Sequence, residues 1–328
     1  TALALTACSG TATPSGSAPA ATSDGGFPVT ITDAFGKTTI PAAPQRVVTW
    51  GYGSADAVLA LGEVPVAIPT QAYGGDEHGM LPWIKDKLAQ LHAKTPQMLD
   101  ASSNQVPVEA VAAAKPDLFL APYSGLTKAE YDQLTGLGIP VVAYPDKPWS
   151  TPWQDVISLT GKALGKQAQA KKLLADIDAA IAKKAKEHPE FKDVTLAQVW
   201  DTSGTFYVYL PADARVQFTE SLGFVTDPAV ASLDTGESTF YTTVSMENLD
   251  RLKDADILVT YADNATQLKA FTGSDAAKLL PQVAKGALAS VVGEAQVTAV
   301  SPPTALSLTW GLDAYVDELA KAVAASKK

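Results

Sequence analysis

The chain has 328 residues, of which 46% are hydrophobic, enough for the cores of about two domains. Its 35 acidic and 25 basic side chains give a formal net charge of −10, which leaves no basic surface to follow a phosphate backbone and excludes nucleic acid as an expected partner. A single cysteine excludes an intrachain disulfide, and no stretch after the first residues approaches the ~18 uninterrupted apolar residues of a membrane span.

The single cysteine, Cys8, follows Leu5-Thr6-Ala7 and precedes a tract without large apolar residues. This order resembles the bacterial lipobox, in which the cysteine becomes the first mature residue and carries a diacylglycerol. We interpret residues 1–7 as the end of a signal peptide and residues 8–26 as a lipidated cysteine with a flexible tether, because Ser, Gly, Thr, Ala and Pro cannot bury enough apolar surface to fold. The alternative, a buried free thiol, has no core here to sit in. The predicted location is the outer face of the cytoplasmic membrane.

Strand and helix patterns alternate after the tether. Period-two alternation on both sides of residues 33–36 predicts a small hairpin. Ser54 is expected to cap a helix that ends near Leu61, and Thr127 with Glu130 has the form of a capping box at the start of another helix. Helical periodicity from Thr151 is expected to break near residues 161–165. Further strands are predicted at residues 46–50, 64–68, 118–121 and 139–144.

The longest helical pattern covers residues 166–188, with Leu173, Leu174, Ile177 and Ile181 in one apolar stripe. At 1.5 Å per residue such a helix reaches roughly 35 Å, the length of a domain. A second α/β half follows, with strands predicted at residues 194–200, 205–210, 256–261 and 296–300 and a last helix at 306–324. The predicted fold is therefore α/β, with an N-terminal lobe at 27–165, a connecting helix at 166–190 and a C-terminal lobe at 191–328.

Both halves contain a short helix with a Glu near its start, followed by a polar turn with Asp and a buried strand. The two acids are Glu109 and Glu247. A Glu in a first helical turn interacts favourably with the helix dipole, which accounts for either acid alone. Matched acids in corresponding places of both halves make that account less adequate.

The order and spacing of several motifs resemble the solute-binding proteins of iron-complex ABC transporters. The motifs are Pro44-Gln45-Arg46-Val47-Val48, Ala60-Leu61-Gly62-Glu63, Lys115-Pro116-Asp117-Leu118, Leu137-Gly138-Ile139-Pro140-Val141, Ser245-Met246-Glu247-Asn248-Leu249 and Trp310-Gly311-Leu312. The resemblance implies two lobes joined by one rigid helix, with a ferric siderophore, or in other branches haem or cobalamin, held in the cleft between them. It further implies a monomer without catalytic activity that delivers its ligand to an ATPase-driven permease. Glu109 and Glu247 match the acids that engage that permease.

Aromatic residues follow many of the predicted strands. Ligands of parallel α/β sheets gather at the carboxyl ends of strands, and aromatic rings suit a bulky ligand with an apolar exterior. For Trp200 and Tyr261 a place in the core is an equally good interpretation. The candidate ligand-binding aromatics are Trp50, Tyr52, Tyr123, Trp149, Trp200, Phe240, Tyr241, Tyr261 and Trp310.

Arg215 is the charged ligand-binding candidate, because it matches a region where related proteins bind the siderophore. The other arginines, Arg46 and Arg251, have ordinary structural explanations. A trianionic catecholate complex needs several cations around it, so a single cleft arginine favours a neutral or weakly charged ferric hydroxamate.

The histidines do not predict a metal site, since His78, His92 and His188 are far apart in the sequence. Fe(III) can be wrapped by hard oxygen donors of the siderophore, so we expect no cofactor bound directly by the protein, while coordination by one tyrosine stays open. Haem and cobalamin also stay open as ligands. A secreted α/β hydrolase is the alternative from another class, but the chain has no Gly-x-Ser-x-Gly motif.

Overall fold

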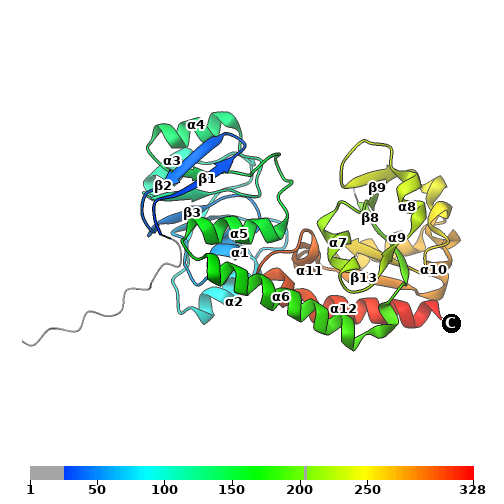
Figure 1. Cartoon of the computed structure of the whole chain (residues 1–328). Coiled ribbons are helices and arrows are strands. Elements are labelled where there is room, and N and C mark those ends of the chain that lie inside the picture. The colour runs from blue at the N-terminus through cyan, green and yellow to red at the C-terminus, as the bar shows by residue number, and fades with distance from the viewer. Residues whose placement is uncertain (1–25, 203–204) are drawn as a thin grey trace, which may run out of the picture.

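The computed structural model describes residues 26–202 and 205–328, so Cys8, the predicted signal segment and nearly all of the tether lie outside it. Two α/β lobes lie side by side, and helix α6 (Gln167–Glu187) runs from one to the other beneath both (Figure 1). The predicted fold, two α/β lobes joined by a long helix, is confirmed. Within the described ranges, no helix combines the length and the hydropathy needed to cross a bilayer.

The N-terminal lobe is built on a parallel sheet with the strand order β5-β4-β3-β6-β7. Its short central strands are buried on both faces, which is why they read as continuous apolar runs. The hairpin is β1 (Val29–Asp33) and β2 (Gly36–Ile40), the sheet strands are β3 (Val47–Thr49), β4 (Ala67–Pro69), β5 (Gln97–Leu99), β6 (Leu118–Leu120) and β7 (Val141–Val142), and the helices are α1 (Ser54–Ala60), α2 (Pro82–Gln90), α3 (Val108–Ala113), α4 (Lys128–Gly136) and α5 (Trp153–Ala163).

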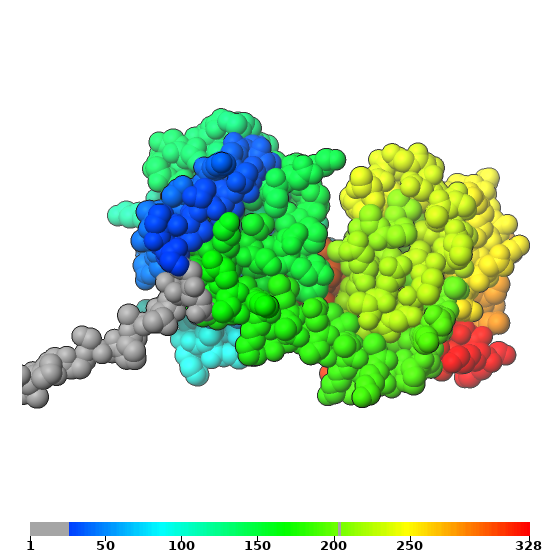
Figure 2. All heavy atoms as spheres, viewed as in Figure 1, coloured from blue at the N-terminus to red at the C-terminus, as the bar shows by residue number. Residues whose placement is uncertain are grey.

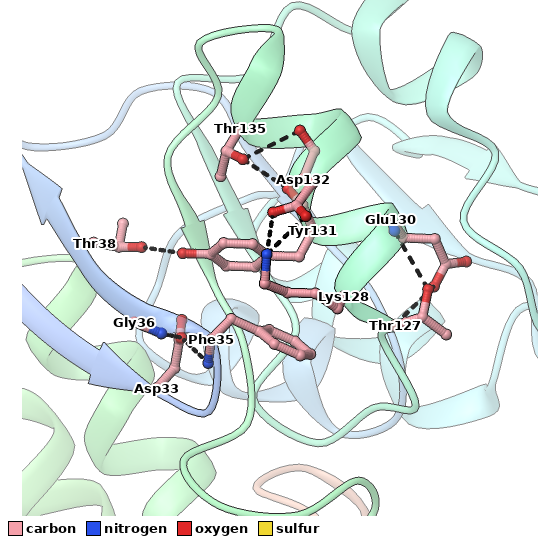
Figure 3. Close-up of polar contacts among 10 residues, drawn as sticks. All are labelled: Asp33, Phe35, Gly36, Thr38, Thr127, Lys128, Glu130, Tyr131, Asp132 and Thr135. Atoms are coloured by element: carbon pink, nitrogen blue, oxygen red, sulfur yellow. Dashed lines mark hydrogen bonds and ion pairs between the residues drawn. The ribbon is translucent and has the colours of Figure 1, made fainter.

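The predicted hairpin is present and packs against α4 (Figure 3) and against β7. Oδ1 of Asp33 accepts two backbone N–H groups of the turn, at 2.9 and 3.1 Å, and its Oδ2 accepts the N–H of Ala143 at 3.0 Å. The ring of Phe35 lies 4.9 Å from that of Tyr131, whose hydroxyl is 3.3 Å from Oγ1 of Thr38. The hairpin thus fixes the chain where it leaves β7 toward the cleft.

The helix starts in this lobe were predicted with mixed success. The capping box is confirmed, because Oγ1 of Thr127 accepts the N–H of Glu130 at 3.3 Å while the Glu130 carboxylate accepts the N–H of Thr127 at 2.8 Å (Figure 3). The prediction that Ser54 caps α1 is wrong. Its hydroxyl donates to the carbonyl of Trp50, and the cap position is Gly53, whose left-handed backbone (φ 72°) few other residues adopt.

Helices α5 and α6 meet at the predicted break. Gly161 of α5 allows their close approach, since a Cβ there would lie 2.4 Å from the Cβ of Ala170 in α6. Along α6, Ile177 and Ile181 are buried as the apolar stripe predicts. The helix is therefore packed firmly against both lobes rather than exposed as a free connector.

Within the described residues, the C-terminal lobe has a six-stranded mixed sheet of order β11-β9-β8-β12-β13, with β10 paired to β8. Strands β9 and β11 run antiparallel to their neighbours. Its strands are β8 (Thr195–Thr202), β9 (Thr205–Tyr209), β10 (Val225–Thr226), β11 (Tyr241–Val244), β12 (Ile257–Ala262) and β13 (Leu288–Val292), and its helices are η1 (Pro189–Phe191), α7 (Ala214–Glu220), α8 (Pro228–Leu233), η2 (Met246–Leu252), α9 (Ala265–Gly273), η3 (Ala277–Leu279), α10 (Pro281–Lys285), α11 (Glu294–Val300) and α12 (Ser307–Ser326).

The strand predicted at residues 296–300 is wrong, because this segment belongs to helix α11. The edge strand is β13, which ends just before Gly293, and the backbone turns there with φ 104°. Four consecutive residues, 297–300, are buried because α11 lies between the lobes (Figure 1). A helix buried on several sides loses its amphipathic pattern and reads like a buried strand.

The two lobes share one continuous hydrophobic core. It includes Val47 and Leu118 of the N-terminal sheet, Ile177 of α6, and Leu196 and Leu308 of the C-terminal lobe. Helix α12 lies against α6, and an ion pair of 2.7 Å joins Lys184 of α6 to Asp313 of α12. Apolar burial across this junction restricts relative motion of the lobes.

Candidate functional site

A notch separates the upper parts of the two lobes in Figure 2. A cavity of about 490 Å³ is lined by residues of the N-terminal lobe and by Pro302, which lies between α11 and α12. The cavity is formed by the segments that follow β3, β4, β5 and β6, which is where a parallel sheet places its ligands. Among the described residues, none that lines it is charged. The lining residues are Trp50, Gly51, Tyr52, Pro69, Thr70, Gln71, Ala72, Ala101, Ser102, Asn104, Tyr123, Trp149 and Pro302.

Four of the predicted aromatics, Trp50, Tyr52, Tyr123 and Trp149, line this cavity together. The backbone N–H of Tyr52 donates to the carbonyl of Tyr123 at 3.0 Å, which ties the end of β3 to the end of β6. Gly51 makes this approach possible, since its φ is +78° and a Cβ there would lie 2.2 Å from the Tyr123 carbonyl oxygen. The chain therefore holds two tyrosines side by side on one wall.

Trp149 stands at the edge of the cavity with 47% of its surface exposed. Its ring meets that of Tyr123 edge to face at 5.5 Å, and its backbone N–H donates to the carbonyl of Ser124 at 3.1 Å. A Cβ at Gly125 would lie 2.7 Å from Nε1 of Trp149, so the indole rests directly on this backbone. The indole of Trp149 is thus fixed in place by its neighbours while much of its surface stays exposed to solvent.

The phenols of this wall are held in the neutral form. Burial, and after it the nearby Asp56 and Tyr123, raise the pKa of Tyr52 well above its ordinary value. Burial also raises the pKa of Tyr123, with a further increase from Asp213 and an opposing effect of Arg215. The hydroxyl of Tyr52 donates to the carbonyl of Thr298 at 2.6 Å. Both phenols are therefore protonated at ordinary pH.

Helix α7 of the C-terminal lobe approaches the same tyrosines. A smaller cavity, of about 30 Å³, is lined by Tyr52 and Tyr123 from one side and by Ala214 from the other. The pairwise electrostatic effects on Tyr123 also come from Asp213 and Arg215. The start of α7 therefore faces the N-terminal wall across the junction.

Arg215 is 9% exposed and held on several sides. Its Nε donates to Oδ1 of Asp213 at 2.7 Å, and its guanidinium carbon lies 3.7 Å from the ring centroid of Tyr209. Its Nη1 is buried without a hydrogen-bond partner in the part of the chain that the structure describes. Asp213 caps α7 by accepting the N–H of Arg215 at 2.8 Å, so the helix start itself positions the ion pair.

Trp200 and Tyr261 are neighbours on paired strands, with their rings 6.0 Å apart, but they differ in burial. Trp200 is half-buried at the end of β8, with its ring 6.3 Å from that of Tyr73 in the other lobe. Its Nε1 is buried and unpaired within residues 26–202 and 205–328. Tyr261 is 2% exposed, and its hydroxyl donates to Oε1 of Gln198 at 2.7 Å. Tyr261 is thus a core residue that supports the C-terminal wall from behind.

Phe240, Tyr241 and Trp310 are not among the residues that line the cavity. Phe240 is exposed and meets Tyr241 edge to face at 4.9 Å. The ring of Trp310, on α12, lies 5.3 Å from that of Trp83 on α2. Trp310 and Trp83 thus join the two lobes beneath the cleft.

A loop at residues 70–80, which was not predicted from the sequence, crosses between the lobes. The hydroxyl of Tyr73 donates to Oδ1 of Asp263 at 2.5 Å, and the N–H of Gly74 donates to Oε2 of Glu294 at 3.2 Å. Thr70 and Gln71 of the same loop line the cavity. They directly follow β4, so the rule that identified the aromatics could also have identified these polar residues.

Glu109 and Glu247 are both exposed, in the first turns of α3 and η2. Neither carboxylate has a hydrogen-bond or ion-pair partner among the residues that the structure describes. They lie on opposite lobes, and neither is among the residues that line the cavity. The matched pair predicted from the sequence is therefore available to another molecule.

Comparisons with known proteins agree with this architecture. Residues 47–291 match the family described as periplasmic binding protein. The chain is 28% identical over 225 residues to the ferric enterobactin-binding periplasmic protein FepB of Escherichia coli O6:H1. The matched segment covers 65% of this chain and 66% of that relative, which is just under two thirds of its length. It is 28% identical over 244 residues to the probable siderophore-binding lipoprotein YfiY of Bacillus subtilis, which covers 73% of this chain and 71% of that protein.

Two solved structures extend the likeness to nearly the whole described chain. Streptococcus pneumoniae PiaA in complex with ferrichrome is 32% identical with a TM-score of 0.80, covering 90% of this chain and 99% of that one. A periplasmic solute binding protein of Mycobacterium smegmatis is 27% identical with a TM-score of 0.77, covering 90% of this chain and 98% of that one. The family resemblance expected from the sequence motifs is confirmed. The chain belongs to the periplasmic binding protein family.

Proposed function

We propose that this protein is the substrate-binding component of an ABC importer, which captures a ferric siderophore between its lobes and delivers it to a membrane permease. The cavity beneath Trp149 carries this proposal. Its volume of about 490 Å³ lies within the range of roughly 300–1,000 Å³ that is usual for small-ligand sites. Rigid aromatic rings and a few neutral polar groups line it, which suits a compact chelate with an apolar exterior.

The proposed siderophore class is a ferric hydroxamate. Three hydroxamate groups balance the charge of Fe(III), whereas three catecholates leave a complex with three negative charges. The relatives span both classes, since FepB binds ferric enterobactin and PiaA was solved with ferrichrome. An uncharged wall, opposed by an arginine that is already paired with Asp213, favours the neutral complex.

In this proposal the protein holds the outside of the chelate and leaves iron to the siderophore oxygens. Trp50, Tyr52, Tyr123 and Trp149 form one wall, and Trp200 with Arg215 forms the opposite wall. Tyr261 supports Arg215 from 5.7 Å away, measured from the guanidinium carbon to the ring centroid. Phe240 and Tyr241 extend the aromatic surface of the C-terminal lobe, and Trp310 braces the junction below. No bond of the ligand is made or broken, so the protein is a carrier and not an enzyme.

Two further contacts complete the proposed cycle. Glu109 and Glu247 would each meet a basic side chain of the permease, which would fix the orientation of the loaded protein. Their exposure, one on each lobe, supports this role. Cys8, which lies outside the described residues, would carry the lipid that holds the protein at the outer face of the membrane.

A tryptophan-fluorescence titration tests the proposal, because an Fe(III) complex quenches nearby indoles. The panel contains ferrichrome, ferrioxamine B, ferric enterobactin, haemin and cobalamin. We expect saturable quenching with the highest affinity for the two hydroxamates. Tightest binding of haemin or cobalamin would assign one of the alternative ligands of this family, and absence of binding by every compound would contradict the proposed function.

A further inference from the structure

The residues around the cleft supply little free positive charge. No charged side chain is among the described residues that line the main cavity. Three acids take part in hydrogen bonds between the lobes, namely Asp56 with Thr304, Asp263 with Tyr73, and Glu294 with Gly74. Among the described residues, Arg215 is the cation whose charge acts on Tyr123 of this wall.

The charge of Arg215 is compensated at close range by Asp213. Oδ1 of Asp213 accepts both the backbone N–H of Arg215, at 2.8 Å, and its Nε, at 2.7 Å. The two side chains are only 11% and 6% exposed, so water screens their attraction weakly. Stacking of the guanidinium on Tyr209 at 3.7 Å leaves it little freedom to leave its partner. The pair therefore acts on a ligand as a dipole rather than as a cation.

This ion pair lies at the start of α7, on either side of a residue that faces the opposite lobe. Ala214, between the two charged residues, lines a cavity together with Tyr52 and Tyr123 of the opposite lobe. The ionisation of Tyr123 is influenced by Asp213 and by Arg215 in opposite directions, which places both charges within electrostatic reach of the N-terminal wall. A ligand held against Tyr123 therefore experiences both charges.

We propose that Asp213 is a charge-selecting residue, which cancels the charge of Arg215 and so makes the cleft prefer neutral or cationic ferric chelates over trianionic ones. This inference rests on the proposed function and deepens it. Asp213 does not itself need to touch the ligand. In water, one unit charge acting on three unit charges at roughly 10 Å changes a binding constant about tenfold, and the effect grows where water is excluded.

The competing explanation is that Asp213 only caps α7 and positions the Arg215 side chain. Asp213→Asn separates the two explanations, because Asn is an equally good cap and its Oδ1 can still accept both N–H groups while the negative charge is lost. Asp227→Asn is the matched control. Asp227 is likewise a buried cap, which accepts the N–H of Ala229 at 2.8 Å at the start of α8.

The experiment measures the dissociation constants of ferrichrome and ferric enterobactin for the wild type and both variants, at low and high salt. In Asp213→Asn we expect the affinity ratio to shift toward ferric enterobactin by about tenfold or more, with a smaller shift at high salt. Asp227→Asn should leave the ratio unchanged. If Asp213→Asn does not fold, Asp213→Ser, which keeps a capping oxygen, replaces it.

The possible failures point to different claims. Charge selection would be contradicted by an unchanged affinity ratio in the Asp213 variant, by an equal loss of affinity for both complexes, or by an equal shift in the Asp227 variant. In each of these cases, ferrichrome binding by the wild type would still support the proposed function. A wild type that binds neither complex would contradict the proposed function itself.

Discussion

The hydroxyl of Thr304 donates a hydrogen bond of 2.5 Å to Oδ1 of Asp56, and this bond joins the segment between α11 and α12 to helix α1 of the other lobe. The same oxygen accepts a hydrogen bond from the Nε1–H of Trp83 at 2.7 Å. Asp56 is 2% exposed, so an acid lies in the hydrophobic junction between the lobes. Burial is the largest influence on this carboxyl and raises its pKa from 3.8 to about 6, against the opposing effect of the two hydrogen bonds.

Asp56 should therefore make the protein less stable as the pH rises through its folded-state pKa. The folded protein binds this proton more tightly than the unfolded chain, so the stabilisation is fully present below pH 3.8 and is lost as the pH rises toward and past about 6. The size is about 3 kcal/mol, an order-of-magnitude figure from the pKa difference. Asp56→Asn keeps an oxygen for both donors and should lack this loss. Urea unfolding of the wild type and the variant from pH 4 to pH 7.5 checks this. The prediction is contradicted if the free energy of unfolding changes with pH in the same way in both proteins.

Trp149 should contribute to ligand binding without contributing much to folding. Its indole is largely exposed and contacts Tyr123, so Trp149→Ala should weaken ferrichrome binding about tenfold or more, the usual effect of removing an aromatic anchor. The free energy of unfolding should change by less than about 1 kcal/mol. Calorimetric titration with parallel urea unfolding measures both quantities. The control is Leu137→Ala, a similarly exposed apolar residue at the end of α4. Equal affinity of the Trp149 variant and the wild type would remove Trp149 from the site.

Glu109 and Glu247 should be needed for transport but not for ligand binding. Replacing both with Ala should leave ferrichrome affinity unchanged and stability within about 0.5 kcal/mol, because both carboxylates are exposed. Iron uptake by cells should fall, with the double variant at least as impaired as either single one. Glu77→Ala, which removes another exposed acid of the N-terminal lobe, is the control. Normal uptake by the double variant would leave only the helix-dipole role, and lost ligand affinity would place these acids in the cleft.

Cys8 should anchor the protein to the membrane. Cys8→Ser in the full precursor removes the sulfur that would carry the lipid, so the protein should be released into the soluble fraction and should no longer incorporate labelled fatty acid. A serine variant that stays acylated and membrane-bound would show that the lipobox interpretation is wrong.

Local signals in the sequence predicted much of the fold. The hairpin turn at Asp33, the capping box at Thr127 and the break before α6 depend on residues close together in the chain, and each is present. The strand wrongly predicted at residues 296–300 fails for a tertiary reason, since residues 297–300 of α11 are all buried and show no alternation from which a helical period could be read.

The same limit applies to the site. The rule that ligands gather at strand ends found Trp50, Tyr52, Tyr123 and Trp149, which share one cavity. It could not separate them from Tyr261, because the direction of a side chain at a strand end depends on what packs against it, and Tyr261 packs inward onto Gln198. Nor could it find the link from Tyr73 to Asp263, whose partners are 190 positions apart in the sequence.

The central claim is that a neutral ferric chelate binds between the lobes, and paramagnetic broadening of backbone amide signals tests it most directly. Spectra with ferrichrome are compared with spectra of its diamagnetic gallium analogue, so that only proximity to Fe(III) changes the signals. We predict selective broadening at Tyr52 and Tyr123 on one wall and at Arg215 on the other. Broadening centred instead on the groove of about 520 Å³ lined by Leu268, Tyr315 and Lys321, or confined to a single lobe, would contradict the account.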